Sequence, residues 1–277
     1  MKISYLGLGI IGSIWVEHAQ EDGHEIRSWN RTPKPDLPGF TSSISDAVAG
    51  AEIIHLCLAD PPAVRSILEQ ILPSLAPGTM VIQSSTISPQ ASQEFEQMVT
   101  TAGYTYLEAP FTGSKPAAQK RDLVFFLGGE EALIDKALPY LRQLSRTHFT
   151  FSKCHLAAAI KLSMNLQIAA ISQALTEGWH LAKHYGISHE AFYGVLRENV
   201  AHSPLAELKE PKLLKTDHSP QFSVKHMGKD LKLALDAGKD LNLSLTKQTQ
   251  EIYEHGIKTG LSELDFIALE KLVRPDS

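Results

Sequence analysis

The chain of 277 residues lacks several features that mark particular protein classes. It has only two cysteines, Cys57 and Cys154, and no Cys-x-x-Cys motif, which excludes a disulfide framework and fits a reducing compartment. It also has no excess of positive charge, because 26 Lys and Arg residues face 31 Asp and Glu residues and give a formal net charge of −5. That sign is wrong for a protein that neutralises nucleic-acid phosphates, so no nucleic-acid partner is expected.

Long apolar runs and metal-ligand spacings are scarce as well. The longest stretch without a charge near its middle, residues 162–176, is interrupted by serine, asparagine and glutamine, whereas a membrane span needs ~20 mostly apolar residues. The one His-x-x-x-His pair, His180 and His184, has no acidic residue between its members to complete a zinc-protease motif. We therefore expect a soluble cytoplasmic protein that contacts no membrane and holds no metal.

The first half of the chain alternates between short β-rich runs and helix-like segments. With 43% hydrophobic and 21% charged residues, the composition is that of a globular protein, and at ~150 residues per domain the length suggests two domains. Strands are expected at Ile3–Leu6, Glu25–Trp29, Glu52–Leu58, Met80–Gln83, Tyr104–Glu108, Leu123–Leu127 and His148–Phe151, and helices at Ile10–Glu21, Pro62–Leu75, Pro89–Ala102 and Glu130–Leu144. This alternation predicts a Rossmann-type α/β domain over residues 1–153.

Beyond Cys154 the pattern becomes helical throughout. Residues 156–185 contain no proline, and helical patterns recur at Glu190–Asn199, Val224–Asp240, Ser244–Thr259 and Glu263–Val273. We therefore expect an all-α domain over residues 154–277 that begins with a long interdomain helix.

A glycine-rich motif follows the first expected strand. Gly7-Leu8-Gly9-Ile10-Ile11-Gly12 is a G-x-G-x-x-G that opens a helix, the arrangement that binds a dinucleotide pyrophosphate. Gly7 is expected to allow the tight turn, Gly9 to let the backbone approach the pyrophosphate, and Gly12 to let helix and strand pack closely. The second expected strand ends in Asn30-Arg31-Thr32, where an NAD site usually has an acidic residue. Arg31 can pair with a 2′-phosphate, and Asn30 and Thr32 can donate hydrogen bonds, so NADP is the expected cofactor. The alternative is a surface arginine in a polar loop.

Four motifs in order resemble the β-hydroxyacid dehydrogenase family, whose members include 3-hydroxyisobutyrate dehydrogenase and tartronate semialdehyde reductase. They are the glycine loop with Asn30-Arg31-Thr32, residues 108–114 (Glu-Ala-Pro-Phe-Thr-Gly-Ser), Lys161-x-x-x-Asn165, and Lys229-Asp230-Leu231. Thr112-Gly113-Ser114-Lys115, Leu58-Ala59-Asp60 and Lys225-His226 are similar to the glyoxylate and succinic semialdehyde reductase branch, which uses NADPH.

The resemblance implies a role for each motif. Lys161 and Asn165 lie one helical turn apart. Lys161 would donate a proton to the substrate oxygen, and the amide of Asn165 would hold that oxygen by a hydrogen bond. Thr112 and Gly113 are expected in the loop after the fifth strand, at the carboxyl end of the sheet, where open α/β folds bind ligands. The resemblance implies that Thr112, Gly113, Ser114 and Lys229 bind a small carboxylate-bearing substrate and that Lys229 also lies near the nicotinamide. Leu58, Ala59, Asp60 and Thr86 would contact the cofactor, although Thr86 could instead cap the helix that begins at Pro89. The family also implies a homodimer or homotetramer formed through the helical domain.

Two departures from the family pattern stand out. His155-Leu156-Ala157-Ala158 occupies the place of Gly-x-Gly-Ala, which is expected to put side chains where the nicotinamide ring approaches the helix. Arg121 stands where the family commonly has glycine. The leading hypothesis is an NADPH-dependent reductase of aldehyde- or keto-acids. Alternatives are a 3-hydroxyisobutyrate or tartronate semialdehyde type dehydrogenase, an imine reductase, or an NADP-binding module without catalysis.

Overall fold

The computed structural model describes residues 1–273. These residues form two compact units that meet in the sequence between Leu162 and Ser163. A single 31-residue helix, α7 (Cys154–His184), runs through that position. Each unit is described by itself below.

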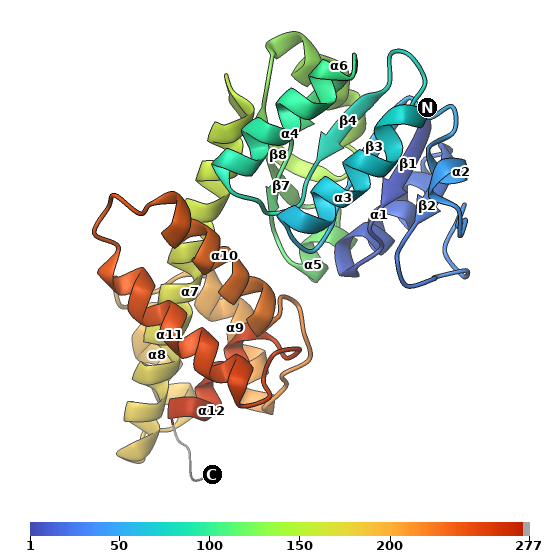
Figure 1. The fold of residues 1–277 in the computed structure, drawn as a ribbon. Coiled ribbons are helices and arrows are strands. Elements are labelled where there is room, and N and C mark those ends of the chain that lie inside the picture. Colours follow the sequence, from blue (N-terminus) through green and yellow to red (C-terminus); the bar gives the residue numbers. More distant parts are fainter. Residues whose placement is uncertain (274–277) are drawn as a thin grey trace. The chain divides into compact units, whose positions relative to one another are not determined.

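The first unit is built on an eight-stranded sheet in the order β2-β1-β3-β4-β5-β7-β6, with β8 beside β7. The strands β1 to β5 are mutually parallel, and β7 is antiparallel to β5. This topology confirms the predicted Rossmann-type domain (Figure 1). The strands are β1 (Lys2–Leu6), β2 (Glu25–Trp29), β3 (Ile53–Leu56), β4 (Met80–Gln83), β5 (Thr105–Glu108), β6 (Phe111–Thr112), β7 (Leu123–Gly128) and β8 (Ser145–Phe151).

Helices cover both faces of this sheet because successive strand residues point to opposite sides. Ile3 and Tyr5 pack on one side in a core shared with α1, α5 and α6, whereas Leu6 packs on the other side with α2, α3 and α4. Figure 1 shows α3 and α4 together on one side of the sheet. The helices are α1 (Ile10–Glu21), α2 (Ile44–Val48), α3 (Pro61–Ile71), α4 (Pro89–Thr101), α5 (Lys115–Gln119) and α6 (Glu131–Leu141).

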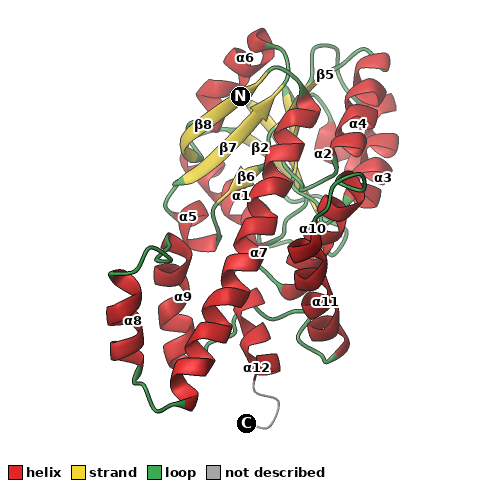
Figure 2. Ribbon diagram, turned by 90° about the vertical axis from the view of Figure 1, so that its left-hand side faces the viewer, coloured by secondary structure: helices red, strands yellow, loops and turns green. Residues whose placement is uncertain are grey.

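The second unit is helical, which confirms the all-α prediction (Figure 2). After α7 come α8 (His189–Arg197), α9 (Pro204–Lys215), α10 (Val224–Ala237), α11 (Ser244–Lys258), the 3-10 helix η2 (Phe266–Leu269) and α12 (Glu270–Val273). Apolar side chains of α7, α10, α11 and η2 share one core.

Two expectations about the second unit are wrong in detail. Helix α9 was not expected, because Pro204 and Pro211 are residues that usually break helices. Pro204 nevertheless lies in the first turn of α9, where proline costs no hydrogen bond. The helix expected at Glu263–Val273 is confined to α12. Its first half is different because the buried carboxylate of Asp265 accepts the backbone N–H of Ile267 and forms a 2.7 Å ion pair with Lys209.

Helix α7 also corrects the statement about apolar runs. By length and composition it could cross a membrane, since the helix continues through Lys161 and Glu177, where the charge-free stretch was taken to end. The core helix of a soluble protein passes the same test. Asn165, Ser172, Gln173 and Thr176 of α7 are buried in the protein, and 33% of the helix's most apolar 18-residue window is buried.

Arg121 adopts a left-handed backbone conformation, with φ at +57°. Glycine is the residue that reaches this conformation without strain, which accounts physically for the family's preference at this position. The guanidinium compensates by binding the carboxylates of Glu21 and Asp22 and the carbonyl oxygens of His18 and Gln143. Arg121 therefore fastens the C-terminal end of α1 to the segment before β8.

Candidate active site

The glycines of the first βα turn have three different steric environments. Gly7 has φ at +105°, and a Cβ added there would lie 2.3 Å from the carbonyl oxygen of Cys57. A Cβ on Gly12 would lie 2.0 Å from the carbonyl oxygen of Gly7, whereas a Cβ on Gly9 would meet no atom within 4 Å. Gly7 and Gly12 therefore allow the turn and the close packing of α1, and Gly9 leaves open space at the N-terminus of α1.

That helix end fits a pyrophosphate. Gly9 caps α1 without a side-chain hydrogen bond and is exposed, and the N–H groups of a helix's first turn have no partners within the helix. They carry the positive end of the helix dipole. The chain thus provides the donors that a dinucleotide's phosphates require.

Asn30 supports this loop directly. Its Oδ1 accepts the backbone N–H of Leu8 at 2.9 Å, and its Nδ2 donates to the carbonyl oxygen of Thr32 at 2.8 Å. Both ends of the amide are thus engaged within the protein. The structure places Asn30 as a residue that positions the glycine loop, which differs from the hydrogen bond to a 2′-phosphate that the sequence suggested.

The end of β2 also brings a lysine that the sequence reading missed. Arg31 and Thr32 are exposed, and Lys34 extends to within 3.4 Å of the hydroxyl of Ser13, on the second turn of α1. Lys34 therefore lies close to the start of the phosphate-binding helix. The signal available in the sequence was its position two residues after Asn30-Arg31-Thr32.

The segments after β3 and β4 are tied to each other. Leu58 donates its backbone N–H to the Ser85 hydroxyl at 2.8 Å, and its side chain packs against Gly7. The Asp60 carboxylate caps α3 by accepting the N–H of Ala63, and Ala59 between them is exposed. The cap of α4 is Ser88, so the alternative in which Thr86 caps this helix does not hold.

A buried carboxyl group supports the loop after β4. Glu108, at the end of β5, is fully buried and accepts hydrogen bonds from Ser92, Tyr106 and Gln83 at 2.7–2.8 Å. Gln83 in turn binds both the N–H and the carbonyl oxygen of Ser85. Burial raises the pKa of Glu108 to about 8, although its three hydrogen bonds act in the opposite direction. The group is therefore protonated in the native protein at neutral pH.

This pKa gives stability a definite pH dependence. Between pH 4.5 and 8 the unfolded chain has lost the Glu108 proton and the native chain keeps it, so the free energy of unfolding falls as pH rises through this range. The contribution is on the order of 3–5 kcal/mol. Glu108→Gln is expected to flatten the dependence, measured by urea unfolding from pH 5 to 8. Glu69→Gln, on an exposed position of α3, is the control, and an unchanged slope in Glu108→Gln would contradict the assignment.

The segment from Phe111 to Ser114 begins with a residue that contacts Lys161. Phe111 and Thr112 form β6, which pairs antiparallel with β7, so the expectation that Thr112 lies in a loop is wrong. Gly113 has φ at +118°, and Ser114 caps α5 without using its hydroxyl. The ammonium of Lys161 lies 5.9 Å from the centre of the Phe111 ring, within the range of a cation–π contact.

In the second unit, a buried carboxylate connects the other two expected site residues. Asp230 accepts a hydrogen bond from Asn165 Nδ2 at 2.6 Å, and its other oxygen lies 2.9 Å from Lys229 Nζ. Asp230 and Asn165 are almost fully buried. The sequence reading included Asp230 in a motif but gave it no role. Its position directly after Lys229 was the available signal.

The departure at residues 155–158 has a local explanation. Ala157 is fully buried. A Cβ added to Gly128 of β7 would lie only 2.8 Å from the Ala157 methyl group. His155 contacts Gln93 of α4 at 3.4 Å. The expectation that Ala157 extends toward a cofactor ring is wrong, because the absence of a side chain on Gly128 makes room for this methyl group against the sheet.

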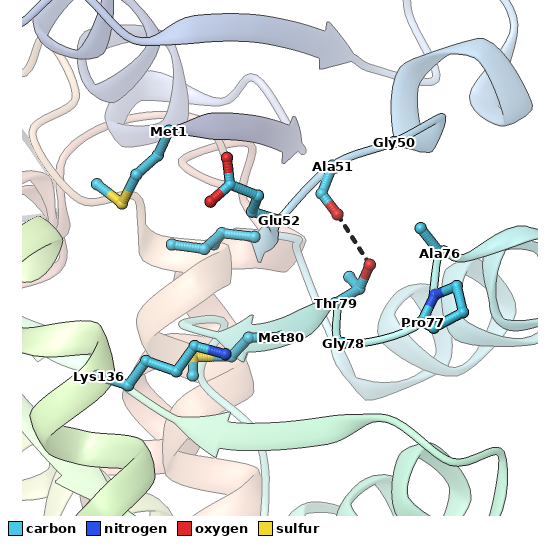
Figure 3. Close-up of a pocket in the computed structure, with 11 residues that line it drawn as sticks. Met1, Gly50, Ala51, Glu52, Ala76, Pro77, Gly78, Thr79, Met80 and Lys136 are labelled. Carbon is cyan, nitrogen blue, oxygen red and sulfur yellow. Dashed lines mark hydrogen bonds between the residues drawn. The ribbon is translucent and has the colours of Figure 1, made fainter.

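A pocket lies at the opposite end of the first unit's sheet (Figure 3). It is formed where β1, β3 and β4 begin, and Thr79 donates a 2.8 Å hydrogen bond to the carbonyl oxygen of Ala51 beside it. Open α/β sheets bind ligands at the carboxyl ends of their strands, so we assign this pocket no part in the site. Its lining residues are Met1, Gly50, Ala51, Glu52, Ile53, Ala76, Pro77, Gly78, Thr79, Met80 and Lys136.

Two family models together cover the described chain. Residues 2–156 match the NAD binding domain of 6-phosphogluconate dehydrogenase, and residues 156–273 match the NAD-binding domain of NADP-dependent 3-hydroxyisobutyrate dehydrogenase. The chain belongs to the β-hydroxyacid dehydrogenase family. This dehydrogenase is therefore an NAD(P)-dependent enzyme.

Relatives of known name match over nearly the whole length. Glyoxylate/succinic semialdehyde reductase 1 of Arabidopsis thaliana is 27% identical, over 99% of each chain. The cytokine-like nuclear factor N-PAC of Mus musculus is 25% identical over 97% of this dehydrogenase but only 50% of its own length.

Solved structures agree with the fold. The Mycobacterium tuberculosis 3-hydroxyisobutyrate dehydrogenase with L-serine has a TM-score of 0.88 at 26% identity over 99% of each chain. An imine reductase from Myxococcus stipitatus in complex with NADP+ has a TM-score of 0.66 at 18% identity, covering 99% of this chain and 100% of its own, which shows a shared fold alone.

Proposed function

We propose that this dehydrogenase is an NADPH-dependent reductase of small aldehyde- or keto-acids, of the glyoxylate or succinic semialdehyde type, with Lys161 as the proton donor. The observation that carries the proposal is the position of the Lys161 ammonium over the ring of Phe111, the residue that directly precedes Thr112-Gly113-Ser114 in the sequence. Similarity to the Arabidopsis reductases, over 97–99% of this chain, supports the substrate class.

Each candidate site residue has a separate role in the proposed reaction. Bound NADPH supplies the hydride, and the protein positions and polarises the substrate. The Lys161 ammonium donates a proton to the oxygen that becomes the alcohol. Asp230 orients Asn165 by accepting from its Nδ2, so this amide is preset to hold the substrate oxygen. Thr112, Gly113, Ser114 and Lys229 bind the substrate's carboxylate.

The preference for NADPH rests on charge. The segment after β2 carries Arg31 and Lys34 and has no carboxylate until Asp36, so a 2′-phosphate would meet cations there. NADH would lose those contacts and gain none. Similarity to a family model of NADP-dependent enzymes supports this assignment.

The test is the initial rate of cofactor oxidation with glyoxylate and with succinic semialdehyde, each with NADPH and with NADH. We expect turnover of these acids with a kcat/KM at least about tenfold higher for NADPH, the minimum for losing one charge-assisted contact. Faster oxidation of 3-hydroxyisobutyrate or of glycerate would instead assign the enzyme to the 3-hydroxyisobutyrate or tartronate semialdehyde type. Reduction of a cyclic imine in preference to both acids, or NADPH binding without any turnover, would overturn the proposal.

Assembly and location stay predictions. Leu181 in the last turn of α7, Tyr185 just after this helix, and Val195 on α8 are 63–76% exposed. Apolar surface of this kind is often covered by a partner. We propose that a second copy of the chain covers it, in a homodimer or homotetramer that a solution mass would measure. The cytoplasmic location likewise stays a prediction.

A further inference from the structure

The first turn of helix α10 contains His226, whose ring is hydrogen-bonded to Ser223, the residue that caps the helix. The Ser223 hydroxyl oxygen accepts the backbone N–H of His226, and it lies 2.7 Å from Nδ1 of the His226 ring. Ser223 is buried, and no other acceptor for its hydroxyl hydrogen is found among residues 1–273. The hydroxyl therefore donates to Nδ1, because a buried donor without a partner is costly. This fixes the neutral ring with its hydrogen on Nε2.

The position of the ring is fixed as well. Phe222 lies nearly parallel to it, with ring planes 18° apart and centroids 6.1 Å apart. Within the part of the chain that the structure describes, Nε2 has no hydrogen-bond partner. Ser223 at Nδ1 and Phe222 against one face therefore orient the His226 ring, and Nε2–H is left as its available donor.

The surroundings of His226 are those of the candidate site in the second unit. His226 precedes Lys229 by three residues and Asp230 by four on α10, so all three share one face of the helix. Burial lowers the pKa of His226, and the positive charges of Lys229 and Lys225 lower it further, against smaller opposing effects of Asp230 and Glu263. The ring is therefore neutral at physiological pH, and only one of its nitrogens can donate.

We propose that His226 is a specificity-determining residue that donates Nε2–H to one carboxylate oxygen of the substrate while Lys229 pairs with the other. The inference rests on the proposed function and gives a role in recognition to His226, to which the motif comparison assigned none. A carboxylate offers two acceptor oxygens, and a cation beside a directional neutral donor matches both. An aldehyde without a carboxylate gains nothing from His226.

The variant His226→Phe removes the donor and keeps an aromatic ring against Phe222. We expect it to raise KM for succinic semialdehyde about tenfold, the loss of one hydrogen bond to a charged group. KM for NADPH and kcat/KM for butanal, which lacks the carboxylate, should stay within about twofold of wild type. In His226→Gln the side-chain amide can replace Nε2–H and should recover part of the loss. Lys225→Ala, which removes an exposed lysine paired with Glu263, is the matched control on the same helix.

Calorimetric binding of 4-hydroxybutyrate to the NADP+ complex separates this inference from the proposed function. Weaker binding in His226→Phe than in wild type supports the inference even where turnover of succinic semialdehyde fails. Equal losses for succinic semialdehyde and butanal, unchanged KM values, or wild-type 4-hydroxybutyrate binding by His226→Phe would each overturn it. Absence of 4-hydroxybutyrate binding in the wild type would overturn it as well.

Discussion

Lys161→Ala is expected to lower kcat roughly 10²- to 10⁴-fold, the usual contribution of a positioned general acid or base. The reason is that reduction of a carbonyl leaves an oxygen that must take up a proton, and the Lys161 ammonium is the donor we propose for it. Lys161 is half-buried and its ammonium lies over the ring of Phe111, outside the buried apolar core, so its truncation should leave that core intact. The NADPH dissociation constant and the melting temperature should therefore remain close to wild type.

Two further variants separate proton donation from simple charge. Lys161→Arg keeps a cation but cannot release its proton, so its kcat should stay low. Lys153→Ala, at an exposed position just before α7, should keep kcat within about twofold. A Lys161→Ala enzyme within tenfold of wild-type kcat, or full recovery in Lys161→Arg, would remove Lys161 from the role of acid. Stopped-flow rates measure kcat, and NADPH fluorescence titration measures the dissociation constant of the cofactor.

The alternating half of the fold was predictable because its signals are local. Helix α1 and the strands β2 and β4 have the bounds that the sequence indicated, since glycines, prolines and β-branched runs mark their ends. Helix α5 and the strand β6 were not foreseen, because elements of two to five residues are too short for a period to show. Helix α9 was missed for another reason, namely that its prolines carry the opposite local signal.

The steric roles of the glycine loop were predictable from the sequence, whereas the contacts made by other candidate site residues were predictable only in part. Motif spacing brought Gly7, Gly9 and Gly12 forward correctly as different steric positions. Motif spacing could not show that Asn30 uses both ends of its amide inside the protein. The contact of Ala157 with Gly128 was equally hidden, because it joins residues 29 positions apart through the sheet. Such contacts depend on tertiary packing, which no local period encodes.

The difference between Gly9 and Gly12 leads to the second large prediction. Gly9→Ala is expected to leave folding intact, because its φ of −68° suits alanine and its Cβ would meet no protein atom within 4 Å. Stability should even rise by about 0.4–1 kcal/mol, since alanine reduces the freedom of the unfolded chain. The new methyl group would occupy the space through which a pyrophosphate approaches α1, so NADPH affinity should fall roughly 10- to 100-fold, the range for losing hydrogen bonds to a charged group.

Gly12→Ala reverses the pattern and is the matched control. Its Cβ would lie 2.0 Å from the carbonyl oxygen of Gly7, and because that oxygen belongs to the backbone, the clash can be relieved only by moving α1 away from β1. We expect a loss of several kcal/mol in the free energy of unfolding, as for other overpacked sites that force backbone shifts. Urea unfolding and NADPH titration of both variants give four values. Wild-type NADPH affinity in Gly9→Ala would mean that no phosphate approaches this helix end. A loss of stability in Gly9→Ala would mean that the added methyl group clashes with protein atoms, against the open space described at Gly9.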